Sequence, residues 1–149
     1  MKTTLKLSAI LFFFVLVTGC GKGNQDTPVL SPEETVAKML TGDGNRYWHL
    51  KALILNGTAQ SLTDAQLQYT KTYTLIYPAT VSGKFTDSDF TAVNGTWKVI
   101  NSSTIREEFL NQAGNYVRID WDITSISENK MDVSYILNNT KTEEIFYAY

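Results

Sequence analysis

Few side chains in this sequence are suited to catalysis. The 149 residues include one histidine and one cysteine. His49 alternates with Trp48 and Leu50 along a predicted strand, so its side chain is expected to face away from these apolar neighbours. No Gly-x-Ser-x-Gly turn offers a nucleophile, and a zinc site would need more His or Cys ligands. The sequence therefore predicts neither an enzyme nor a bound metal or cofactor.

Carboxylates occur in pairs, which is one requirement for acid–base chemistry. The pairs are Asp87/Asp89, Glu107/Glu108, Asp120/Asp122 and Glu143/Glu144. A glycosidase needs two carboxyl groups that oppose each other in a cleft, whereas these pairs are expected on turns or on outward strand faces. Asp87 and Asp89 could offer oxygens to calcium, but the EF-hand pattern is missing. We expect these pairs to be non-catalytic.

Glu107 differs from the other carboxylates because its strand parity points it inward. Its neighbours at two-residue spacing are Ile105 and Phe109. A buried carboxylate is costly unless it is paired. Glu107 is therefore either a residue at the rim or a polar group aimed at a ligand, and we favour the rim, near the mouth of a cavity.

Aromatic residues supply most of the remaining candidates. Five of them, from five predicted strands, share the inward parity: Trp48, Tyr73, Trp97, Trp121 and Tyr135. In a small domain most inward aromatics are core residues. The functional alternative is an aromatic cavity that binds a small apolar or amphipathic molecule.

The elements that must position these residues are predicted from alternating apolar and polar residues. Ser31 followed by a proline and two acids predicts a short helix from Pro32 to about Leu40. Asn56-Gly57 predicts a turn with no strand directly after it, and a short helix or ordered loop is expected within 61–68. Predicted strands cover 47–54, 71–77, 81–85, 90–93, 96–100, 104–110, 117–123, 131–137 and 142–149.

The fold class predicted from this pattern is all-β. Strands joined by short turns must be mostly antiparallel, because parallel strands need long crossovers. An open sheet of eight or nine strands would expose its edges, so we expect an antiparallel up-and-down β-barrel of about eight strands with a short N-terminal helix. A two-sheet sandwich is the alternative, which alternation alone does not exclude.

The N-terminal segment has the three parts of a secretory signal. Lys2 and Lys6 precede an apolar run from Leu7 to Val17, which small residues follow. The run has about eleven residues, whereas a membrane-spanning helix needs roughly 20. We therefore predict a signal peptide over residues 1–19.

Cys20 follows this signal directly. Val17-Thr18-Gly19-Cys20 resembles the bacterial lipobox, in which the cysteine becomes the first residue after cleavage. The resemblance implies that the thiol of Cys20 carries diacylglycerol, which would anchor the protein in a membrane through its acyl chains. An ordinary secretory signal with a chance cysteine is the alternative.

The predicted mature chain has two parts. Residues 20–31 are polar and rich in Gly, Asn, Gln and Pro, which is typical of a flexible tether, and residues 32–149 form one domain. Without Lys2 and Lys6, 11 basic residues stand against 15 acidic ones, which gives a charge of −4. This acidic balance argues against nucleic acid as a partner.

Several short motifs together suggest a family. They are Leu40-Thr41-Gly42, Trp48, Asn56-Gly57, Gly95-Thr96-Trp97 and Ile123-Thr124-Ser125-Ile126-Ser127 with Met131. This segment, about 105 of the 149 residues, resembles the small bacterial lipocalin-like lipoproteins. It departs from the true lipocalins because Gly44 stands four residues before Trp48 and no Arg that could pack on this Trp follows Arg118.

Together these features predict a lipid-anchored binding module of the cell envelope. Gly21, which follows Cys20, does not resemble an inner-membrane retention signal, so we expect the outer membrane. Its ligand would be a small hydrophobic or amphipathic molecule held in the barrel by Trp48, Tyr73, Trp97, Trp121 and Tyr135, with Glu107 at the mouth. The alternative is a non-catalytic envelope protein with a filled barrel that acts through contacts with other envelope proteins.

Overall fold

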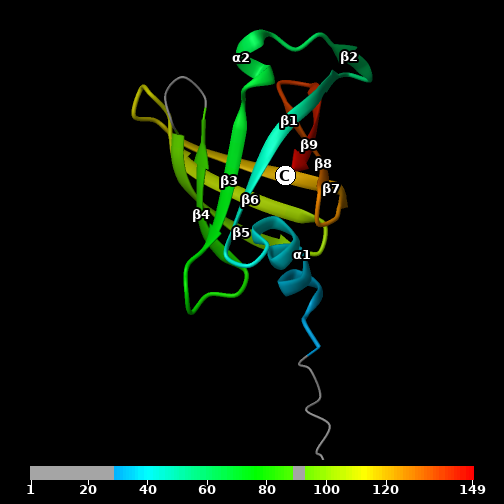
Figure 1. The fold of residues 1–149 in the computed structure, drawn as a ribbon. Coiled ribbons are helices and arrows are strands. Elements are labelled where there is room, and N and C mark those ends of the chain that lie inside the picture. The colour runs from blue at the N-terminus through cyan, green and yellow to red at the C-terminus, as the bar shows by residue number, and fades with distance from the viewer. Residues whose placement is uncertain (1–28, 89–92) are drawn as a thin grey trace, which may run out of the picture.

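The fold is a closed antiparallel barrel, seen in a computed structural model that describes residues 29–88 and 93–149 (Figure 1). Two helices and nine strands lie within these ranges. The helices are α1 (Pro32–Thr41) and α2 (Asp64–Leu67). The strands are β1 (Asn45–Leu55), β2 (Thr58–Gln60), β3 (Thr70–Leu75), β4 (Ser82–Asp87), β5 (Val93–Asn101), β6 (Thr104–Leu110), β7 (Tyr116–Ile126), β8 (Lys130–Leu137) and β9 (Thr140–Ala148).

Closure of the sheet depends on β1. This strand pairs with β3 near its start and with β9 along most of its length, and a register shift lies between Leu50 and Ala52. The order β1-β3-β4-β5-β6-β7-β8-β9 thus returns to β1 and makes an eight-stranded up-and-down barrel of lipocalin-like architecture. The predicted fold class is confirmed, and the sandwich is excluded.

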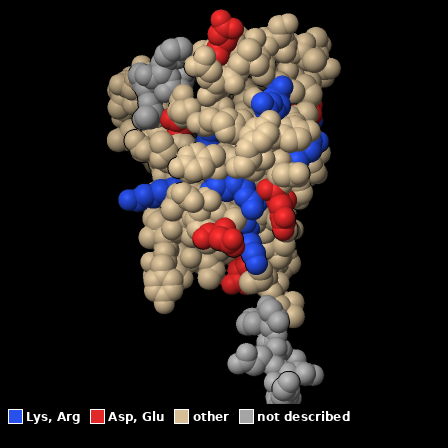
Figure 2. Space-filling model, in the orientation of Figure 1, with Lys and Arg blue, Asp and Glu red and all other residues tan. Residues whose placement is uncertain are grey.

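The barrel encloses an apolar core with the inward parity expected from the sequence. Trp97, predicted to be a core residue, is 2% exposed. The other buried apolar residues of the strands are Trp48, Leu50, Tyr73, Phe85, Val99, Ile105, Trp121, Met131, Val133 and Phe146. Outward-facing charged residues pair on the wall, as Arg106 does with Asp120 at 2.6 Å. Acidic and basic side chains are interspersed on the face shown in Figure 2.

Helix α1 covers one end of the barrel. The Ser31 hydroxyl accepts from the backbone N–H of Glu34, whose carboxylate in turn accepts from the N–H of Ser31, so the predicted start of the helix is confirmed. Leu40 is fully buried, and its carbonyl accepts a hydrogen bond from the Trp48 indole at 2.9 Å. This bond joins the end of α1 to β1.

The opposite end of the barrel carries α2 and the β1–β2 hairpin (Figure 1). Asn56 and Gly57 turn the chain with φ of 47° and 81°, as an Asn-Gly turn permits. The expectation that no strand follows this turn is wrong, because β2 pairs with β1 directly after it. Of the strand predicted over 90–93, Val93 begins β5, while the other three residues lie outside the described ranges.

No helix in the described ranges is both long enough and apolar enough to cross a membrane.

Candidate functional site

An ion pair lies in the middle of the barrel. The Lys71 ammonium, on β3, is 3.2 Å and 3.1 Å from the two carboxylate oxygens of Glu107 on β6. The Lys71 and Glu107 side chains are 3% and 2% exposed. Strand parity explains the approach, because both side chains point into the closed barrel, as those of Tyr73 and Ile105 do.

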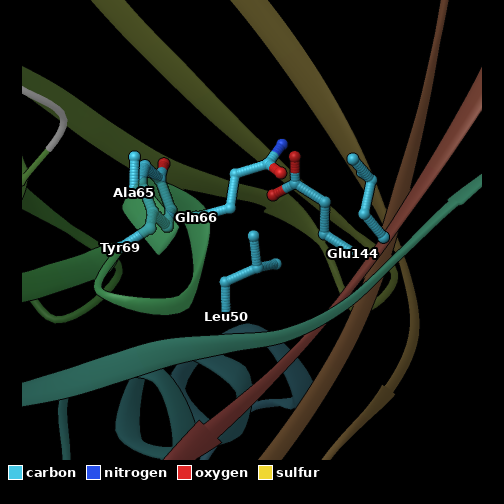
Figure 3. A pocket seen from close by; sticks show the side chains of 6 residues that line it. Leu50, Ala65, Gln66, Tyr69 and Glu144 are labelled. Atoms are coloured by element: carbon cyan, nitrogen blue, oxygen red, sulfur yellow. The ribbon is translucent and has the colours of Figure 1, made fainter. Parts of the chain in front are cut away.

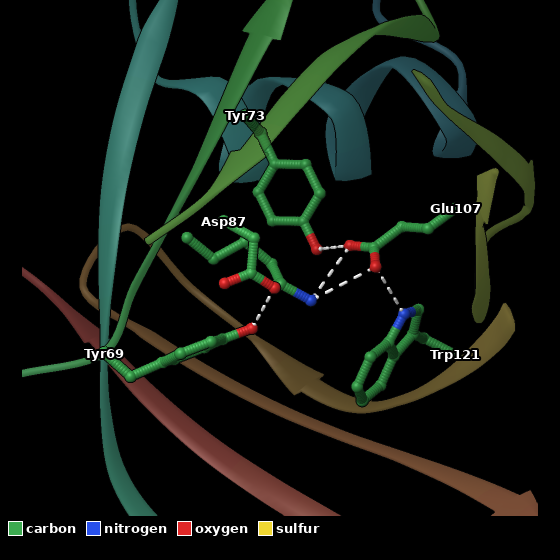
Figure 4. Close-up of polar contacts among 6 residues, drawn as sticks. Tyr69, Tyr73, Asp87, Glu107 and Trp121 are labelled. Atoms are coloured by element: carbon green, nitrogen blue, oxygen red, sulfur yellow. Dashed lines mark hydrogen bonds and ion pairs between the residues drawn. The ribbon is translucent and has the colours of Figure 1, made fainter. Parts of the chain in front are cut away.

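Two aromatic donors complete the coordination of Glu107. The Tyr73 hydroxyl donates to Oε1, and the Trp121 indole N–H donates to Oε2 at 2.9 Å. Figure 4 shows Tyr73 and Trp121 approaching Glu107 from different sides. The Lys71 ammonium also lies 4.4 Å from the centre of the Trp121 ring, a cation–π distance. Both charges are therefore satisfied within the protein.

The surroundings of this cluster shift the pKa values of Lys71 and Tyr73. Burial alone lowers the pKa of Lys71, but the carboxylates of Glu107, Glu144 and Asp87 outweigh burial and raise this pKa above its ordinary value. Burial, followed by the Glu107 carboxylate, raises the pKa of Tyr73 well above its ordinary value. Lys71 therefore stays charged and Tyr73 stays protonated near neutral pH.

The placement of Glu107 at the rim is wrong. Glu107 is 1% exposed and lies inside the barrel, because Lys71 compensates the cost of burying its charge. Parity predicted its direction correctly. Its partner was missed, although Lys71 has the same parity as Tyr73 and could have been found from that spacing.

The predicted aromatic residues do converge on the interior. Trp48, Tyr73, Trp97 and Trp121 are at most 5% exposed, and Tyr135 is half-buried with its ring 4.7 Å from that of Trp121. Each indole N–H is bonded inside the protein; that of Trp97, for example, donates to the Thr74 carbonyl at 3.3 Å. These residues pack together as core, and their role in ligand binding stays a prediction.

An arginine does pack on Trp48, although none follows Arg118 in the sequence. The guanidinium of Arg46, on the same strand, stands 5.7 Å from the centre of the Trp48 ring and donates to the Met39 carbonyl at 2.6 Å. A local arginine thus links β1 to the end of α1.

A cavity of about 210 Å³ lies at the α2 end of the barrel. Its lining residues come from β1, from α2 and the residues that follow it, and from β9: Leu50, Leu53, Ala65, Gln66, Tyr69 and Glu144. In Figure 3 the side chains of Gln66 and Glu144 extend toward each other over Leu50. The capping box of α2 positions Gln66, whose amide oxygen accepts from the backbone N–H of Thr63 at 3.0 Å.

Glu144 is the unusual residue of this cavity. It has the inward parity of Thr142 and Phe146, and its Oε2 atom is buried with no hydrogen-bond partner. Burial raises the pKa of Glu144 to about 7; the Lys71 ammonium opposes this rise, while Glu107 and Asp87 add to it. The expectation that the Glu143/Glu144 pair lies on a turn or an outward strand face is wrong for Glu144.

Tyr69 links the cavity to the interior cluster. Its hydroxyl donates to Asp87, the cross-strand neighbour of Lys71 (Figure 4). Burial, then the Asp87 carboxylate, raises the pKa of Tyr69, so the hydroxyl remains a donor. Tyr69 therefore presents a neutral ring to the cavity.

No family model, curated protein or solved structure matches this chain. The family resemblance therefore stays a prediction, and the site must be interpreted from its own geometry. Within the described ranges no group of three His, Cys, Asp or Glu side chains could hold a metal ion. His49 packs edge-on against Tyr149 with ring centres 5.4 Å apart. Cys20 lies outside the described residues.

Proposed function

We propose that this protein is a lipid-anchored binding module of the cell envelope that holds a small amphipathic ligand in the cavity at the α2 end of its barrel. The observation that carries this proposal is the position of Glu144, which has a buried carboxylate oxygen without a partner and lines a cavity together with Leu50, Leu53, Ala65, Gln66 and Tyr69. Small-molecule sites typically combine apolar surface with a few well-placed polar groups.

The proposed site differs from the aromatic cavity expected from the sequence. The five aromatic residues named there supply the rigid core beneath the ligand, and a different set of residues would contact it. An anchor at Cys20, expected from the lipobox resemblance, would keep this module at the membrane. We propose that this is the outer membrane.

The experiment is to occlude the cavity. Ala65→Phe places a ring at the cavity wall, and Ala79→Phe adds the same ring at the other end of the barrel, in the β3–β4 loop. The full chain and both variants, in lipid nanodiscs, would be titrated with small amphiphiles and followed by calorimetry. We expect saturable binding that A65F abolishes and A79F retains. Equal binding by both variants would refute the α2-end site.

A filled barrel that acts through protein contacts is the second candidate. It is favoured by the packing of Trp48, Trp97 and Trp121, whose polar atoms are all bonded within the protein. Under this alternative no small amphiphile would bind, and crosslinking in the envelope would instead join the barrel wall to a neighbouring protein.

A further inference from the structure

The cavity at the α2 end has an uncompensated negative group. Glu144 Oε2 has no partner, and no ion pair joins Glu144 to Lys71 in the part of the chain that the structure describes. Gln66 does not neutralise it, because an amide carries no charge; its amide oxygen accepts from the Thr63 backbone N–H at 3.0 Å. A group from outside the protein could supply the missing partner.

The charges inside the barrel favour a cation in that place. The carboxylates of Glu107, Glu144 and Asp87 all act on the Lys71 ammonium. The ammonium of Lys71 is already bound by Glu107 on both oxygens and lies against the ring of Trp121. One positive charge placed beside Glu144 would balance the charge of that carboxylate.

Other ligand classes fit this site less well. An anion would face the Glu144 carboxylate with no positive charge on the cavity wall to attract it. A metal ion needs several ligands, and Glu144 is the one carboxylate among the lining residues. An organic ammonium needs one charge partner for its N–H donors.

The cavity walls restrict the size and polarity of the uncharged part of the ligand. Leu50, Leu53, Ala65 and the Tyr69 ring are apolar or present apolar surface. The cavity volume of about 210 Å³ equals the share of roughly seven liquid waters. This space suits a single ring or a short alkyl chain.

We propose that the ligand of this cavity is a small primary amine with an apolar body, whose ammonium donates a charge-assisted hydrogen bond to the carboxylate of Glu144. This inference rests on the proposed binding function and names its ligand class. The apolar body would lie against Leu50, Leu53 and Tyr69, and the Gln66 side chain would border the ammonium.

Three probes of nearly equal shape separate the effect of the ligand's charge from the effect of its shape. Benzylamine, benzyl alcohol and benzoate would be titrated by calorimetry against the full chain in nanodiscs at pH 8. We expect benzylamine to bind at least roughly tenfold more tightly than benzyl alcohol, because hydrogen bonds between charged groups are the stronger ones, and benzoate not to bind.

A pair of adjacent variants assigns the effect to one carboxylate. Glu144→Gln keeps the shape and removes the charge, so benzylamine should lose its advantage over benzyl alcohol. Glu143→Gln is the matched control, because Glu143 pairs with Lys141 at 3.0 Å on the outer wall, and it should leave benzylamine binding unchanged.

Dependence on pH provides a test in the unaltered chain. Glu144 has a pKa near 7, and the groups that face it are Lys71, Asp87, Glu107 and Tyr69. Below pH 7 Glu144 takes up a proton while the amine stays charged, so benzylamine affinity should fall by roughly tenfold per pH unit. Benzyl alcohol affinity should change little.

The outcomes distinguish the two proposals. Equal binding of benzylamine and benzyl alcohol, preference for benzoate, or unchanged benzylamine binding in E144Q would overturn the amine assignment and leave the binding function standing. Failure of all three probes to bind would overturn the amine assignment. If amphiphiles of every other class also failed, the binding function would fall with it.

Discussion

The Lys71 ammonium lies 3.1 Å from Oε2 of Glu107 at the centre of the barrel, where neither side chain has more than 3% of its surface exposed. The pair joins β3 to β6, which lies three places further along the sheet. With the Tyr73 and Trp121 donors, it forms a polar core that crosses the barrel. Charges buried in this way are costly when separated, which makes the pair a sensitive test of the fold.

Replacing Lys71 with Met should destabilise the protein strongly. The change leaves the Glu107 carboxylate buried without its counter-ion, and removing one partner of a buried ion pair costs about 3–5 kcal/mol. Denaturant unfolding at pH 7, followed by Trp fluorescence, would measure this loss in the free energy of unfolding.

Two controls test the explanation for K71M. Lys84→Met, on the exposed face of β4, should have little effect on stability. Adding Glu107→Gln to K71M should recover part of the loss, since it removes the orphaned charge and keeps an acceptor for Tyr73 or Trp121. If K71M were as stable as the parent protein, the ion pair would not hold the barrel together.

Glu144→Gln should stabilise the ligand-free protein at high pH. Burial raises the pKa of Glu144 to about 7 from an ordinary 4.5, so its contribution to stability is complete below pH 4.5 and is lost as the pH rises to 7. The variant should therefore gain about 3 kcal/mol at pH 8 and almost nothing at pH 4.5. Urea unfolding across this pH range would show the difference.

The neighbouring Glu143→Gln variant should lack this dependence on pH, because Glu143 lies on the outer wall beside Lys141. A gain of equal size at every pH in E144Q would instead point to better packing by the amide and would contradict an ionised, unpaired carboxylate.

Gly83→Ala should loosen the region of the barrel around Trp97. A methyl group on Gly83 would lie 1.8 Å from the Thr74 carbonyl oxygen and 3.0 Å from the Trp97 indole nitrogen. Because that oxygen accepts the indole N–H, the strand must shift, at a cost of about 1–3 kcal/mol or more. Thermal unfolding of G83A beside Ser82→Ala would isolate the effect of the clash, and equal melting temperatures would refute it.

Cys20→Ser tests the proposed anchor. Serine has no thiol to form the thioether, so the variant should leave the membrane fraction for the soluble one, and its mass should lack the acyl groups. Immunoblots of fractionated cells and intact mass spectrometry of both proteins would provide the measurements. Retention of C20S in the membrane would exclude Cys20 as the anchor.

Much of the barrel could be predicted from the sequence because parity along a strand determines which side chains face the core. Trp48, Trp97 and Trp121 were placed inward in this way, and all three are buried. Closure could not be predicted from alternation, since it depends on β1 pairing with β9 and a sandwich would show the same pattern.

The candidate site was harder to predict because its chemistry arises from distant residues. Glu107 was assigned to the rim because its partner Lys71 lies 36 residues away in sequence. Glu144 has the parity of Phe146, so its direction could have been found. Its unpaired state depends on the neighbours that the closed barrel brings around it, and local patterns do not contain that information.

The pairing of β1 with β9 also determines when the native state can form. These strands stand at opposite ends of the barrel sequence, so a folding chain exposes an unpaired β1 edge until β9 docks. Contacts that are distant in sequence slow folding, and open strand edges invite pairing with other chains. The interval before the last strand docks is therefore the time at which this protein is most exposed to aggregation and most dependent on chaperones.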